Sequence, residues 1–116
     1  MRKNIEDIIQ QKIVRYCHMN NIKVIGSAGG LKLPIGQAAK AKRMGIVVKG
    51  YPDLFFPGLK MFIELKRKGG RPSKEQKEWK LLLTSQGVLY ILARSLDDVI
   101  NILKEDENIT FGRFQK

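Results

Sequence analysis

The most constraining feature of the sequence is a pair of short apolar runs separated by a Pro-Gly turn. Residues 54–56 and 61–65 have the composition of β-strands, and the loop 57–60 that joins them begins with Pro-Gly. A loop of this length joins antiparallel strands and fixes their register, so that Phe56 pairs with Met61. The sequence therefore predicts a β-hairpin in a single register.

The other segments alternate between helical and extended patterns. Two further strands are expected at residues 22–25 and 88–93, the second of a buried type. Helices are expected at residues 4–19, 37–44, 73–86 and 95–103. In the third helix one apolar face is expected to join the core, through Trp79, Leu82 and Leu83. The order α-β-(α)-β-β-α-β-α predicts an α/β fold, a mixed sheet flanked by helices.

Length and terminal sequence set the expected organisation. The chain has 116 residues, which is typical of one domain, and residues 105–116 are expected to form a C-terminal tail. The sequence has no apolar run of the roughly 20 residues that a membrane span requires, and residues 1–12 lack the apolar stretch of a signal peptide. A cytoplasmic protein with no membrane partner is therefore expected.

The charge balance indicates a polyanionic partner. Lys and Arg number 22 and Asp and Glu 11, which gives a net charge of +11, and such an excess most often serves nucleic-acid binding. The single cysteine, Cys17, and the single histidine, His18, exclude an intrachain disulfide, a Cys-rich zinc site and catalysis by a pair of histidines. We expect Cys17 to be a core thiol and His18 to lie at a helix end.

The distribution of acidic residues is more informative than their number. Between residues 8 and 74 the sequence has fourteen Lys and Arg residues but only two acids, Asp53 and Glu64. A phosphate-binding surface should lack carboxylates, because each of them repels the ligand. These two acids are therefore either paired with bases or hold a cation that reverses the local charge.

The predicted hairpin places both acids at one point. In its register Asp53 lies directly opposite Glu64, and like charges in that position destabilise a strand pair unless a divalent cation lies between them. Side chains alternate along a strand, so Glu64 and Lys66 project from the same face. Two carboxylates and an ammonium group suit phosphodiester hydrolysis assisted by Mg²⁺ or Mn²⁺, in which Lys66 orients the water or stabilises negative charge.

These residues resemble a known nuclease family. Gly-Tyr-Pro-Asp at 50–53 and Glu-Leu-Lys at 64–66 resemble the core motifs of the PD-(D/E)xK superfamily. The chain is similar to VRR-NUC domains, the virus-type replication–repair nucleases, because Glu6 precedes these motifs and Gln76 follows them. The similarity includes the basic Ala-Lys-Arg-Met-Gly stretch before the first motif and the Gly-Val-Leu-Tyr-Ile-Leu strand after Gln76. The similarity covers most of the chain, and its length resembles the stand-alone members of phages and bacteria.

The resemblance carries expectations for the fold, the site and the substrate. It implies a restriction-endonuclease-like core, with Asp53, Glu64 and the Leu65 carbonyl as metal ligands and Lys66 as the catalytic lysine. Glu6 and Gln76 would complete the site, and Glu6 could help to hold a second ion. Stand-alone members are similar to Holliday junction resolvases, so the resemblance implies a homodimer that acts on branched DNA, a four-way junction or a flap.

Basic residues near these motifs are candidates for DNA contacts. One group precedes the first motif and another follows the Glu-Leu-Lys strand, and each could instead be a solvated surface. The candidates are Lys40, Lys42, Arg43, Lys49, Arg67, Lys68 and Arg71. The sequence does not indicate the dimer interface, although Phe111 and Phe114 in the tail are candidates to cover it.

Structural explanations compete with each catalytic assignment. Asp53 could be a turn residue, Glu6 could serve the helix dipole, and Gln76 could complete a capping box with Ser73. Two other functions also compete with a nuclease. One is a nucleic-acid-binding module with a nuclease fold and no activity, and the other is a small basic structural or ribosome-associated protein.

Overall fold

The computed structural model describes residues 4–27, 34–46 and 50–105. Lys49 and the tail residues Phe111 and Phe114, to which the sequence assigns roles, lie outside them. The elements follow the predicted order: α1 (Ile5–Met19), β1 (Ile25–Gly26), α2 (Ile35–Arg43), β2 (Leu54–Phe56), β3 (Met61–Leu65), α3 (Lys74–Ser85), β4 (Leu89–Ala93) and α4 (Leu96–Glu105). The expected α/β class is therefore confirmed.

The four strands form one mixed sheet in the order β1-β2-β3-β4. The pairs β1–β2 and β2–β3 are antiparallel, whereas β3 and β4 are parallel. Phe56 pairs with Met61 and Leu54 with Ile63, which confirms the predicted hairpin register. Asp53 directly precedes Leu54, and the same register therefore brings it to Glu64.

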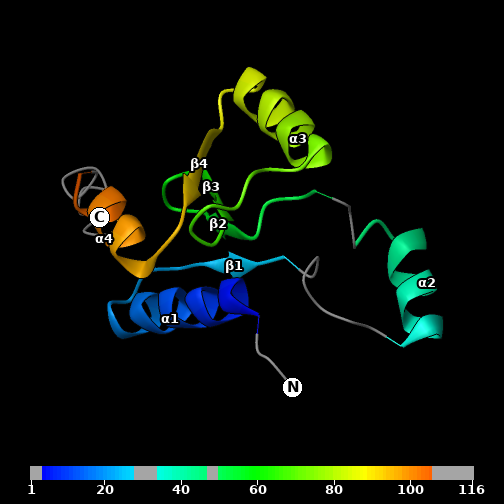
Figure 1. The fold of residues 1–116 in the computed structure, drawn as a ribbon, viewed down its shortest axis with the longest axis horizontal. Coiled ribbons are helices and arrows are strands. Elements are labelled where there is room, and N and C mark those ends of the chain that lie inside the picture. Colours follow the sequence, from blue (N-terminus) through cyan, green and yellow to red (C-terminus); the bar gives the residue numbers. More distant parts are fainter. Residues whose placement is uncertain (1–3, 28–33, 47–49, 106–116) are drawn as a thin grey trace.

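The two faces of the sheet differ in the side chains that they present. On one face, side chains such as Leu54, Met61 and Ile63 join Ile13 and Cys17 of α1 and two residues of α4 in the hydrophobic core. Figure 1 shows α1 and α4 close to the sheet and α3 at a distance from α1. Because side chains alternate along strands, Glu64 projects from the opposite face, away from this core.

The opposite face is aromatic and lies under α3. Phe55 and Phe62 pack across the hairpin, with ring centroids 4.6 Å apart. Tyr51 meets Phe62 edge-on at 5.5 Å and Trp79 of α3 at 5.0 Å. These contacts place the first turns of α3 above the strands, where the site residues emerge.

Two apolar residues are more exposed than predicted. Leu82 of α3 is 47% exposed and Leu89 of β4 is 51% exposed, so the predictions of a core Leu82 and of a fully buried strand are wrong at these positions. The reason is topological: β4 is an edge strand, and Leu82 lies on the outer side of a helix that covers only part of the sheet. Leu83 is buried as predicted.

Two boundaries in the first half of the chain also differ from the prediction. β1 contains only Ile25 and Gly26, because Ile22 instead continues the end of α1 by donating its N–H to the Cys17 carbonyl at 2.8 Å. α2 begins at Ile35 after Pro34, earlier than expected, since proline is well accommodated at a helix start. At the start of α4, Ser95 Oγ accepts the N–H of Asp98, whereas the Asp98 carboxylate accepts the N–H of Arg94.

None of the helices in the described ranges is both long and apolar enough to cross a membrane. Cys17 is fully buried and His18 lies in the last turn of α1, as predicted.

Candidate active site

Asp53 is held rigidly at the start of the hairpin. Its Oδ2 accepts the backbone N–H of Leu65 at 2.7 Å, and its carbonyl accepts the N–H of Ser27 at 2.9 Å. The preceding Pro52 is buried and has no N–H that would need a partner. Asp53 is therefore more than a turn residue, because its carboxylate reaches across to the end of β3.

Glu64 is the one charged residue buried within the described part of the chain, with 2% of its surface exposed. Gln76 Nε2 donates to its Oε2 at 2.9 Å, and the Tyr90 hydroxyl donates to its Oε1 at 3.3 Å. Burial, and then a hydrogen bond and charge repulsion from Asp53, raise the pKa of Glu64 to about 9, although Lys66 and Tyr90 act in the opposite direction. Glu64 therefore favours its protonated form in the protein without a bound cation.

This carboxyl pair has the properties of a divalent-cation site. Two carboxyl groups converge, that of Glu64 buried, and both offer hard oxygen ligands, which Mg²⁺ and Mn²⁺ prefer. A cation would offset the repulsion between Asp53 and Glu64 and favour the charged form of Glu64. Leu65, whose carbonyl is the third predicted ligand, ends β3 beside both residues.

Gln76 completes the cap of α3 and also contacts the Glu64 carboxylate. Its Oε1 accepts the N–H of Ser73 at 2.8 Å and its N–H donates to Ser73 Oγ, which is a complete capping box at the start of α3. Its Nε2 is left free to reach Glu64. The cap thus orients the amide that contacts the buried carboxylate.

The loop before Asp53 packs directly against this helix start. Gly50 has φ +80°, and a Cβ built there would lie 2.6 Å from the backbone carbon and the Cβ of Glu75. Only glycine fits this position, because it adopts the left-handed backbone conformation readily and has no Cβ that would collide with Glu75. Gly50 therefore brings α3, and with it Gln76, onto the hairpin.

Lys66 and Glu6 lie at the edge of the carboxyl pair. Lys66 follows β3 directly, is partly exposed, and is near enough for its charge to lower the pKa of Glu64. Glu6 reaches from α1 to the same strand end, where its Oε2 accepts the N–H of Arg67 at 3.4 Å. The described ranges contain no group of three His, Cys, Asp or Glu side chains placed to hold one ion, so Glu6 is not gathered with Asp53 and Glu64.

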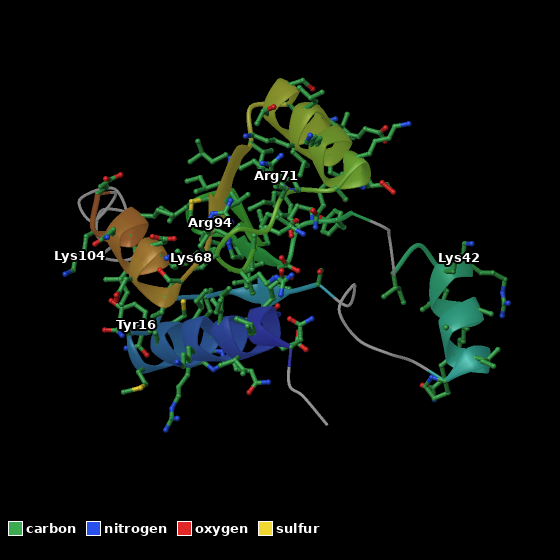
Figure 2. All side chains as sticks on the ribbon, viewed as in Figure 1. Tyr16, Lys42, Lys68, Arg71, Arg94 and Lys104 are labelled. Carbon is green, nitrogen blue, oxygen red and sulfur yellow. The ribbon has the colours of Figure 1, made fainter. Side chains whose placement is uncertain are left out.

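The predicted DNA-contacting residues fall into two separate groups. Arg67, Lys68 and Arg71 are exposed on the loop that follows β3, beside the carboxyl pair. The other group, Lys40, Lys42 and Arg43, belongs to α2, which stands apart from the sheet, as the position of Lys42 in Figure 2 shows.

Two residues of the site were not found from the sequence. Tyr90 pairs with Phe62 in the parallel β3–β4 ladder and therefore faces the same side as Glu64. Arg94, just beyond β4, donates from Nη1 to the carbonyls of Arg67 and Gly70, each at 2.8 Å. Alternation in β4 could have revealed Tyr90 if the β3–β4 register had been known, whereas no sequence pattern marks Arg94.

Comparison with solved structures finds a similar chain. It is titled "VRR_NUC domain protein", is 25% identical, and superposes with a TM-score of 0.71 over 94% of this chain and 93% of its own. No family profile matches the sequence. No curated protein matches it either.

The neighbour agrees with the family resemblance that the motifs carry. It matches the chain over nearly its whole length, and the α/β order with its four-stranded mixed sheet is that of a nuclease fold. The chain therefore has the fold of a VRR-NUC domain.

Proposed function

We propose that the protein is a divalent-metal-dependent endonuclease that hydrolyses phosphodiester bonds in DNA. The observation that carries the proposal is the convergence of the Asp53 and Glu64 carboxyl groups beside the ammonium group of Lys66, in a chain of net charge +11. A buried carboxyl group with a second one beside it is costly, and a metal-dependent reaction on a polyanion gives a reason to keep this pair.

Each residue of the site has a distinct role in this proposal. Asp53, Glu64 and the Leu65 carbonyl hold Mg²⁺ or Mn²⁺, which when bound lowers the pKa of a water and offsets phosphate charge. Lys66 orients the attacking water or stabilises the negative charge that develops on the phosphate. Gln76 keeps the Glu64 carboxylate in its orientation through the 2.9 Å hydrogen bond. Glu6 completes the site by ordering the backbone of Arg67.

We further propose branched DNA, a four-way junction or a flap, as the substrate and a homodimer as the active form. Each chain carries one Asp53–Glu64 pair, so two cuts in opposite strands require two copies related by symmetry. The VRR-NUC fold supports a nucleic-acid substrate, and the exposed bases beside the site supply contacts to its backbone.

The proposal is tested by cleavage of labelled four-way junction, flap, duplex and RNA substrates with Mg²⁺, Mn²⁺ or EDTA. We expect metal-dependent cleavage of branched DNA that is lost in Asp53→Asn and Glu64→Gln, while both variants still bind DNA. Arg15→Met, on the exposed side of α1, serves as the control for purification and for loss of charge.

The two competing functions give different results in the same experiment. Salt-sensitive DNA binding without turnover under any metal would indicate a non-catalytic binding module. Failure of millimolar Mn²⁺ to raise the melting temperature would favour a basic structural protein. Cleavage by purified Glu64→Gln at the parental rate would overturn the proposal.

A further inference from the structure

The turn that follows the catalytic strand is unusually well fixed for an exposed basic loop. The N–H of Gly70 donates to the Arg67 carbonyl at 2.9 Å, and Gly69 has φ +82°, as the third residue of a type II turn requires. Lys68 therefore lies at the tip of a closed turn.

Arg94, which follows the neighbouring strand β4, holds this turn by hydrogen bonds. Its Nη1 donates to both the Arg67 and the Gly70 carbonyls at 2.8 Å, the two ends of the turn. Its own backbone N–H donates to the Asp98 carboxylate at 2.8 Å, which ties this position to the first turn of α4. Figure 2 shows Arg94 near Lys68, between α4 and the sheet. The position of the turn relative to the sheet is therefore set at both of its ends.

The 67–70 turn is cationic and adjoins the candidate site. It starts directly after Lys66, its first N–H bonds Glu6, and Lys68 and Arg71 are exposed on it or next to it. Arg94 adds a further positive charge to this group, although like charges repel. Such a cluster is favourable when a polyanion lies against it, and pre-formed contacts lose less conformational entropy when the ligand binds.

We propose that Arg94 is a positioning residue for DNA: it holds the 67–70 turn so that Lys68 and its neighbours contact the phosphate backbone beside the bond that is cut. The inference rests on the proposed function for its ligand, and it assigns Arg94 an effect on DNA binding that acts through the turn. The Arg94 guanidinium donates to carbonyl groups of the turn, whereas the side chain of Lys68 is exposed and can contact phosphates.

The experiment is a double-mutant cycle between Arg94 and Lys68, read out as affinity for a labelled four-way junction and a duplex in EDTA, where no cleavage occurs. Arg94→Met and Lys68→Ala should each weaken binding, by about fivefold to tenfold for the first. The double variant should bind no more weakly than Arg94→Met alone, because the turn that presents Lys68 has already been released. Arg15→Met removes the same charge from α1 and should bind as the parent does.

Two further readouts separate positioning from a purely structural role. The slope of log Kd against log salt should fall by about one for Arg94→Met, because at least one phosphate contact is lost. The melting temperature of each variant shows whether it is folded; should Arg94→Met unfold, Arg94→Lys, which keeps the charge without the planar fork, takes its place in the cycle. An unchanged slope in the folded variant would overturn the inference.

The outcomes also distinguish this inference from the proposed function. Additive losses in the cycle, or parental affinity in Arg94→Met, would overturn the role of Arg94 while leaving hydrolysis untouched. Parental DNA binding without metal-dependent cleavage, together with a non-additive cycle, would overturn the hydrolytic proposal and support the inference. Absence of DNA binding by the parent would overturn both.

Discussion

At the scale of single residues, the candidate site is centred on the buried carboxyl group of Glu64. The sequence located Asp53, Glu64 and Lys66 because strand alternation and loop length determine which side chains meet across a hairpin. Tyr90 could not be found in that way, since its contact with Glu64 depends on the parallel register of β3 and β4, which is set by tertiary packing.

Replacing Glu64 by Gln should stabilise the metal-free protein at neutral and alkaline pH. The folded state raises the pKa of Glu64 from 4.5 to about 9, so the parent should lose stability as the pH rises through that range. Glu64→Gln cannot ionise and should lack this loss, with a gain on the order of 1 kcal/mol at pH 8, or roughly 4–8 °C in melting temperature. Thermal melts in EDTA at pH 5 and pH 8 measure it. A variant less stable than the parent at pH 8 would contradict the assigned electrostatics.

Tyr90→Phe removes one hydroxyl from the Glu64 carboxylate and leaves the ring in place. Groups that orient metal ligands commonly change metal affinity or activity by about 10–100-fold, so weaker Mn²⁺ binding is expected with little change in the metal-free melting temperature. Calorimetric titration with Mn²⁺ measures the affinity. Tyr16→Phe, on α1, is the matched control, and equal affinities in both variants would show that the Tyr90 hydroxyl does not orient Glu64.

At the scale of elements, local signals predicted the hairpin and the helix caps, while contacts across the sheet determined the rest. Residues 54–56 and 61–65 form strands with the predicted ends, because a Pro-Gly loop and alternating apolar side chains fix both. β1 was placed too early because a two-residue strand exists only through its pairing with β2. The capping box on α3 was predictable, but its use to aim Gln76 at Glu64 was not, because that depends on how α3 packs onto the hairpin.

Gly50→Ala should separate α3 from the hairpin. The substitution adds a Cβ 2.6 Å from Glu75 and also forces a side chain into φ +80°. Gly87→Ala is a matched control, because Gly87 has φ +79° and open space around it. The control should cost about 1–2 kcal/mol for the backbone alone, and Gly50→Ala should cost more and abolish cleavage. Urea denaturation and the junction assay measure the two effects; equal losses of stability would show that the close contact is unimportant.

At the scale of the whole molecule, the net charge of +11 predicts a polyanionic ligand, and the VRR-NUC fold supports this prediction. Charge is readable from composition because it requires no knowledge of packing. The position of α2 apart from the sheet was not readable, because its basic and apolar residues fit a surface helix in any location.

A homodimer with one site per chain predicts paired cuts that a mixed dimer cannot make. A plasmid with an extruded four-way junction should be linearised by the parent, and an excess of Glu64→Gln should convert the product to nicked circles. The nicked fraction is read from a gel. An excess of Arg15→Met should leave linear product, and a nicked fraction unaffected by Glu64→Gln would show that each copy acts alone.

The most direct measurement is a crystal structure of the protein grown with Mn²⁺, with the anomalous signal of manganese recorded. The predicted result is a manganese peak held by oxygen atoms of both Asp53 and Glu64, with Lys66 beside it. A peak elsewhere on the molecule, or carboxyl groups that turn away from each other with no manganese between them, would contradict the proposed metal site and the hydrolytic function that depends on it.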